Sequence, residues 1–202
     1  MNTRKRFTTA LVFAVLSIAC AAPNDTSSKQ PATAHAAKSE AQPRRPFELF
    51  PANAPLPTEG FDNPPELPFR LTDHVIRLNQ MRKFYGPPGE FGYYIDGADY
   101  GFKSLSFILT ETHPNGGPNL HTHETEEAHI LLEGKVTYLI GDRRFTVEGP
   151  YITRVPAGVP HTFINAGSAP FNLIAVFPDG RPNYAKGDLG PNPLINKEQE
   201  PE

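Results

Sequence analysis

The sequence predicts a single domain of the all-β class. Short runs rich in β-branched and aromatic residues recur from residue 103 onward, and turn-forming residues separate them. Proline and glycine are abundant, at 23 and 16 of 202 residues, which disfavours a bundle of long helices. No segment of useful length after residue 22 has the apolar periodicity of a helix. These features are typical of short-stranded sheets packed as a sandwich or barrel.

Seven strands are expected in this domain, with the turns between them marked by glycine, proline or asparagine. The residues before the first strand, 85–100, are interpreted as a loop because Gly86-Pro87-Pro88-Gly89 indicates a turn. The expected strands lie at residues 103–112, 127–132, 136–140, 145–148, 151–155, 161–165 and 171–177.

Composition narrows the class of protein further. The net charge is -3, and no block of basic residues follows the first few positions, so nucleic acid is not an expected partner. Cys20 is the only cysteine, which excludes an internal disulfide and a cysteine-based zinc site. The length suits one domain with tails.

Residues 1–22 have the layout of a bacterial secretory signal peptide. Three basic residues at 4–6 precede an apolar stretch at 10–19, and small residues follow it. The apolar stretch is short for a permanent membrane span. The alternative is a buried N-terminal helix, which the basic flank and the polar continuation disfavour. We therefore expect an exported protein.

The end of the predicted signal peptide resembles a lipoprotein cleavage site. Ser17-Ile18-Ala19-Cys20 places the sole cysteine where lipid would be attached, although Ser17 stands where leucine is usual. Ordinary signal cleavage near Cys20 is the alternative. The expected location is the periplasm or the outer membrane as a lipoprotein, with membrane contact only through this N-terminus.

The remaining chain divides by composition. Residues 23–45 are rich in Ala, Ser, Thr, Pro, Lys and Gln and are predicted to be a flexible linker. The domain is expected over residues 46–180, and a polar tail over 181–202. Residues 46–69 combine prolines with large apolar side chains. We interpret them as an extended arm across a sheet of the same chain or of a partner, which leaves a homodimer open.

Four side chains have the chemistry of a metal site. His121 and His123 are two positions apart, so they share a face of an extended chain. Glu127 follows four positions later, and His161 enters another expected strand after a sharp turn. Three imidazoles and one carboxylate suit one divalent transition metal, among Fe, Mn, Ni, Zn, Co and Cu.

These residues carry a family resemblance. The pattern H-T-H-x3-E-x6-G at residues 121–134 resembles the first motif of the cupin family, and P-A-G-x2-H-x3-N at residues 156–165 resembles the second. The resemblance implies a double-stranded β-helix, the jelly-roll cupin barrel. It also implies four metal ligands, which are His121, His123, Glu127 and His161. The alternative is a degenerate cupin that binds no metal.

Other residues are candidates for the surroundings of the metal. His129 shares a strand face with Glu127 and could act as a general base or support the metal ligands, or could be an inert core residue. Phe163, Tyr138 and Phe107 are candidates for the pocket wall, although a barrel core needs such residues anyway.

The cupin resemblance implies a metal-dependent enzyme that acts on a small organic molecule, with a dioxygenase of the quercetinase type as the first choice. Isomerases and lyases are the enzymatic alternatives. A cupin that binds or senses a small ligand at the cell envelope, without converting it, is another. In the last alternative, the metal only ties the sheets together.

Overall fold

The computed structural model of this chain describes residues 47–51, 54–182 and 187–195, all within one unit, Gln42–Glu202. The predicted signal peptide, the lipidation candidate Cys20 and the predicted linker lie outside these residues, as does part of the predicted tail. Within the described ranges, no helix has the length and apolar character needed to cross a membrane.

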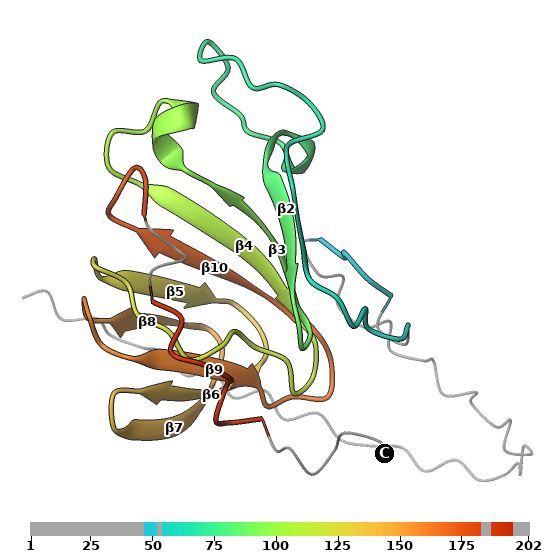
Figure 1. The fold of residues 1–202 in the computed structure, drawn as a ribbon, viewed down its shortest axis with the longest axis vertical. Helices are drawn as coiled ribbons and strands as arrows, with labels where there is room; N and C mark the ends of the chain where they lie inside the picture. Colours follow the sequence, from blue (N-terminus) through green and yellow to red (C-terminus); the bar gives the residue numbers. More distant parts are fainter. Residues whose placement is uncertain (1–46, 52–53, 183–186, 196–202) are drawn as a thin grey trace, which may run out of the picture. The chain divides into compact units, whose positions relative to one another are not determined.

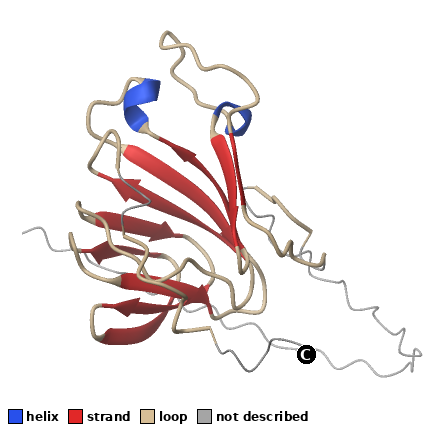
Figure 2. Cartoon of the chain, viewed as in Figure 1, coloured by secondary structure: helices blue, strands red, loops and turns tan. Residues whose placement is uncertain are grey.

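Two antiparallel sheets make up the described residues, which confirms the all-β prediction (Figure 1). The larger sheet has the order β1 (Phe61–Asn63), β2 (Arg82–Gly86), β3 (Glu90–Ile95), β4 (Ser106–Thr112), β10 (Phe171–Phe177), β5 (Glu127–Leu131) and β8 (Tyr151–Val155). The smaller sheet has the order β7 (Arg143–Glu148), β6 (Lys135–Ile140) and β9 (His161–Asn165). The helical segments in Figure 2 are two short 3₁₀ turns, Leu78–Gln80 and Gly97–Tyr100.

The apolar core lies between the two sheets and follows the alternation of the strands. In β10, every second side chain is buried while the intervening ones are more exposed. These inward side chains meet those of β5, β6 and β9, so one cluster joins both sheets. Its buried members are Leu131, Val136, Tyr138, Phe163, Phe171, Leu173, Ala175 and Phe177.

The prediction of a loop over residues 85–100 is wrong in part. The turn at residues 86–89 joins β2 to β3 as an antiparallel hairpin that pairs with β4 through β3. Gly89 adopts a φ of 79°, a conformation that favours glycine. Because the turn residues dominate this stretch, they obscure the short strands on either side. The larger sheet therefore extends three strands beyond the elements expected from the sequence.

Residues 47–50 lie against the outer face of the larger sheet. The buried Glu111 carboxylate accepts hydrogen bonds from the backbone N–H groups of Leu49, at 2.8 Å, and Phe50, at 3.2 Å. The Phe50 ring stacks on Phe91 with 4.8 Å between centroids. Two hydrogen bonds to a buried carboxyl group and an aromatic stack thus hold this segment on the domain.

Candidate metal centre

His121 and His161 lie directly opposite each other across an isolated antiparallel bridge. Their backbones exchange two hydrogen bonds: His121 N–H donates to the His161 carbonyl at 3.0 Å, and His161 N–H donates to the His121 carbonyl at 2.8 Å. Residues opposed in this way point their side chains to one side. The two imidazole centroids are 4.3 Å apart.

A glycine allows the segment before His121 to approach β9 this closely. A Cβ added at Gly117 would lie 1.9 Å from the carbonyl oxygen of Phe163, which is far inside van der Waals contact. The next residue is tied to the same strand, because the Thr162 hydroxyl donates to the Pro118 carbonyl at 2.7 Å. Local backbone packing thus sets the distance between two candidate ligands.

His123 and Glu127 complete the group. Glu127 is the first residue of β5, and its Oε2 is 2.9 Å from Nε2 of His161 and 3.4 Å from Nε2 of His123. One possible ligand atom from each of the four residues lies within 4.8 Å of the others. His123, Glu127 and His161 are buried, and His121 is partly exposed. The structure therefore brings together all four residues that the sequence predicts as ligands.

Hydrogen bonds fix the tautomers of two of the histidines. Nδ1 of His121 is 2.7 Å from the Asn119 carbonyl oxygen, and Nδ1 of His161 is 2.9 Å from that of Val159. A carbonyl oxygen only accepts, so each Nδ1 carries the proton when the ring is neutral. The lone pair then lies on Nε2, on the side that faces the group. Such outer hydrogen bonds are typical of metal-binding histidines.

The pKa values favour the deprotonated forms that bind metals. Burial and the neighbouring His161 lower the pKa of His121 to about 4. Burial also lowers the pKa of His123. Burial alone would raise the pKa of Glu127, but the neighbouring His129 holds it well below its usual range. At neutral pH, these groups present lone pairs and a carboxylate.

The donor set fits a divalent transition metal. Imidazole nitrogen and carboxylate oxygen are ligands for Fe, Mn, Co, Ni, Cu and Zn. Nδ1 of His123 is buried and has no hydrogen-bond partner among the residues that the structure describes, so its ring is the least constrained of the three. The group His121, His123, Glu127 and His161 can therefore hold one such ion.

His129 contacts the other oxygen of the Glu127 carboxylate. Its Nε2 is 2.8 Å from Oε1 of Glu127, and its Nδ1 is 3.2 Å from the hydroxyl of Tyr138. The Tyr151 hydroxyl donates to that of Tyr138 at 3.1 Å. Because the carboxylate only accepts, a neutral His129 donates from Nε2 and accepts at Nδ1. A chain of hydrogen bonds thus ends on the carboxylate and fixes its orientation.

A cavity of about 250 Å³ adjoins the group. Its wall includes three of the four candidate ligands, His129, several apolar side chains from both sheets and two further carboxyl groups. The lining residues are Phe84, Glu90, Ile108, Thr110, Pro118, Asn119, His121, His123, Glu127, His129, Phe163, Leu173, Ala175, Phe177 and Asp188. A molecule bound in this cavity would lie directly against the candidate metal centre.

The three residues expected in the pocket wall have different positions. Phe163 lines the cavity. Phe107 does not, because Ile108 and Thr110 supply the inward positions of β4 and alternation turns Phe107 to the outer face. Tyr138 is also outside the wall. It is buried in the core behind His129, where it makes the hydrogen bond described above.

Glu90 is one of the polar wall residues to which the sequence motifs do not point, with Thr110, Asn119 and Asp188. It is the first residue of β3, inside the stretch interpreted as a loop. Burial and the nearby Glu127 carboxylate raise its pKa to about 8. The aromatic and β-branched residues of Glu90–Ile95, directly after the turn, are the signal that could have indicated a strand at Glu90.

The family comparison agrees with the fold and the site. The family model of the cupin domain matches residues 108–177, from β4 to the end of β10. This range contains all four candidate ligands and both sequence motifs. Residues 108–177 are therefore similar to the cupin domain, in agreement with the resemblance that the two motifs carry. A comparison with curated proteins finds no match.

Solved structures of other cupin-fold proteins are similar to this chain. Oxalate decarboxylase of Bacillus subtilis, which has Mn(II) centres, is 22% identical with a TM-score of 0.45, covering 48% of this chain and 27% of the decarboxylase. The Lactobacillus farciminis oxalate decarboxylase is 19% identical with a TM-score of 0.47, over 52% and 33%. The polyketide cyclase RemF of Streptomyces resistomycificus is 20% identical with a TM-score of 0.45, over 52% and 79%. This chain spans a third or less of the two decarboxylases.

Proposed function

We propose that this protein is a metal-dependent enzyme that acts on a small organic molecule bound in the cavity beside the three histidines and Glu127. The observation that carries the proposal is the position of the cavity, whose wall includes His121, His123 and Glu127. A ligand there meets the metal directly. A metal that only tied the sheets together would not need such a space beside it.

The cavity limits the size and character of the substrate. Its volume of about 250 Å³ is below the usual range of roughly 300–1,000 Å³ for pockets that hold drug-sized ligands. Phe163, Phe177 and Leu173 supply flat and aliphatic surfaces, while the carboxyl groups supply hydrogen-bonding positions. A single-ring phenol or a short diketone fits this combination of size and chemistry.

The residues around the cavity would have different roles in such a reaction. His121, His123, Glu127 and His161 would hold the metal, which when bound acts as a Lewis acid on a substrate oxygen. His129 orients the Glu127 carboxylate through Nε2, and it also lines the cavity, where it could move a proton of the substrate. The apolar wall excludes water from the bound molecule.

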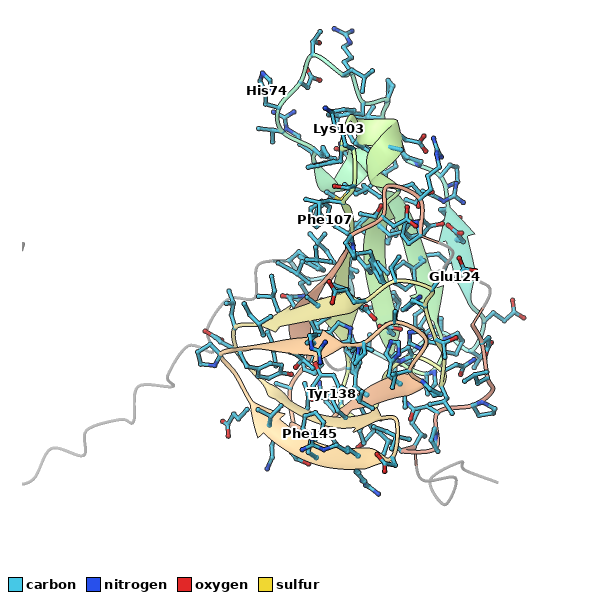
Figure 3. The ribbon with its side chains drawn as sticks, turned by 90° about the vertical axis from the view of Figure 1, so that its left-hand side faces the viewer. His74, Lys103, Phe107, Glu124, Tyr138 and Phe145 are labelled. Atoms are coloured by element: carbon cyan, nitrogen blue, oxygen red, sulfur yellow. The ribbon has the colours of Figure 1, made fainter. Side chains whose placement is uncertain are left out.

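Oxygen-dependent cleavage is the first reaction to test. We expect purified protein to contain about one equivalent of a divalent metal, and to consume oxygen with catechol or acetylacetone. The His161→Ala variant should lose roughly 100-fold or more of this activity. His74→Ala is the control, because His74 is exposed on a loop at the other end of the described fold from Tyr138 (Figure 3).

Other outcomes of this experiment point to the alternatives. Conversion of either compound without oxygen uptake would support an isomerase or a lyase. Tight binding without conversion would support a ligand-binding cupin. Absence of both metal and binding would contradict the proposed function.

We also propose, from the sequence alone, that the protein is exported to the periplasm and that lipid at Cys20 anchors it to the outer membrane. A substrate from outside the cytoplasm would then reach the cavity. Radiolabelled palmitate incorporated into the wild-type protein but not into Cys20→Ser would support lipidation, and signal cleavage without label would contradict it.

A further inference from the structure

We propose that Glu90 is a substrate-contacting residue, whose carboxyl group hydrogen-bonds a hydroxyl, enol or carbonyl group of the molecule held beside the metal centre. The proposal rests on the proposed function and names the substrate class more closely, as a neutral hydroxy or oxo compound. Nothing in the two cupin motifs points to this residue, because Glu90 precedes the first motif by 31 positions.

The hairpin of β2 and β3 directs Glu90 into the barrel. Glu90 pairs with Gly86 on β2 and with Thr112 on β4, immediately after the turn at residues 86–89. Opposed residues share a face, and Thr112 lies two positions from Thr110, which lines the cavity. Strand parity therefore agrees with the position of Glu90 in the cavity wall.

A glycine on the same strand allows an aromatic ring to lie beside Glu90. Gly92 is the next inward position of β3, and a Cβ there would lie 2.6 Å from the Phe84 ring. Without that Cβ, the Phe84 ring occupies the space and forms the adjoining piece of the cavity wall. A ligand in contact with Glu90 would thus also meet an aromatic surface.

Glu90 differs from the buried Glu111 and Glu127 in having no partner among the described residues. Its carboxyl group makes no hydrogen bond or ion pair with any residue described by the structure. Glu111, by contrast, accepts from two backbone N–H groups, and Glu127 contacts His129 and His161. The hydroxyl of Thr112, directly across from Glu90, is also buried without a hydrogen-bond partner in the described part of the chain. The Glu90 carboxyl group lines the cavity, so its hydrogen-bonding positions are available to a ligand bound there.

The titratable groups around the cavity indicate which class of ligand Glu90 can bind. The titratable groups that share the wall with Glu90 are Glu127, Asp188, His121, His123 and His129. In the metal-free protein, burial and Glu127 raise the pKa of Glu90 to about 8, which favours the protonated carboxyl group at neutral pH. A protonated carboxyl group both donates and accepts, which matches a hydroxyl, enol or carbonyl group.

The experiment observes the Glu90 carboxyl directly. Zinc-loaded full-length protein, labelled with ¹³C at the glutamate carboxyl carbons, is titrated with catechol and with acetylacetone. The Glu90 signal is assigned as the one that is missing in Glu90→Gln. We expect this signal to shift on saturation with at least one probe, while the signal of exposed Glu148 stays in place.

Affinity of the variants gives a second readout. Glu90→Ala should bind the same probe about tenfold more weakly, and Glu90→Gln should lose less because its amide still donates and accepts. Glu148→Gln, on β7 and outside the cavity wall, should bind as the wild type does.

Two results would overturn the proposal. One contradicts only the role of Glu90, and the other also contradicts the proposed function. If a probe binds the wild type but leaves the Glu90 signal and the Glu90→Ala affinity unchanged, Glu90 does not contact the substrate, and the proposed function still stands. Failure of both probes to bind the zinc-loaded wild type would remove the proposed function together with the role of Glu90.

Discussion

At the scale of single residues, Glu127 connects the two sides of the site. Its Oε2 faces His161 and His123, and its Oε1 faces His129. A carboxylate whose Oε1 is hydrogen-bonded to His129 would present Oε2 to the metal in a fixed orientation. His129 is therefore a positioning residue for Glu127 in this structure, besides any contact that it makes with substrate.

Replacing His129 with alanine should weaken metal binding by about 10- to 100-fold, because Glu127 loses the donor that orients it. A zinc titration against a chelating indicator measures this affinity. Tyr138→Phe is the matched control, since it removes only the next hydrogen bond of the chain and should have a smaller effect. Unchanged affinity in a folded His129→Ala protein would mean that His129 merely fills the core.

The raised pKa of Glu90 predicts a pH effect on stability. Between the ordinary glutamate pKa of 4.5 and about 8, the folded wild type keeps a proton that the unfolded chain has released. Folding then takes up a proton, so this contribution to stability falls as pH rises through that window. Metal-free Glu90→Gln should gain stability relative to the wild type from pH 5 to pH 8, as measured by urea unfolding. A constant difference, like that expected for Glu148→Gln, would contradict the raised pKa.

At the scale of elements, the site depends on the segment 114–122 lying along the free edge of β9. Backbone bridges at Pro114 and His121 attach this segment to Asn165 and His161. It contains no regular strand of its own, but it places one ligand opposite another. The smaller sheet and segment 114–122 together hold His121 and His161 in place, and we call these two elements the frame of the metal centre.

Gly117→Ala should disturb that frame. The added methyl group would overlap the Phe163 carbonyl, so the segment must move away from β9. We expect a loss of unfolding free energy of about 1–3 kcal/mol, together with weaker zinc binding. Gly86→Ala is the control, since a Cβ there meets nothing within 4 Å. If both variants have wild-type stability and affinity, the close approach at Gly117 is not required.

The sequence predicts those parts of the fold and of the site that depend on patterns of neighbouring residues. The strands after residue 103 and the four ligand positions follow from alternation, turn residues and the two motifs. β1 to β3 were missed because prolines and turn residues interrupt the stretch before residue 90 and obscure these short strands, and Glu90 was missed with β3. Phe107 was misplaced because residue type alone does not decide which face of β4 it occupies.

At the scale of the whole molecule, an apolar row crosses the outer face of the larger sheet. Ile152 on β8 pairs with Ile130 on β5, which pairs with Ile174 on β10, which pairs with Leu109 on β4. Ile152 is 73% exposed and Ile174 is 36% exposed. Such a row is suited to an interface with a second copy of the chain, in line with the homodimer that the sequence left open.

Light scattering should accordingly give the mass of a dimer for the wild type, and that of a monomer for Ile152→Glu. Leu71→Glu is the matched control, because Leu71 is 72% exposed but lies on a loop away from the row. A monomeric wild type, or a dimer that tolerates Ile152→Glu, would contradict this use of the outer face.

We expect His121, His123, Glu127 and His161 to hold one divalent metal ion together. Anomalous diffraction from crystals of the metal-loaded protein, recorded at the absorption edge of that metal, tests it most directly. We expect a single strong peak at roughly 2.0–2.2 Å from a nitrogen of each histidine and from a carboxylate oxygen of Glu127. A structure without a peak among these four side chains, or with the metal bound elsewhere, would contradict the claim.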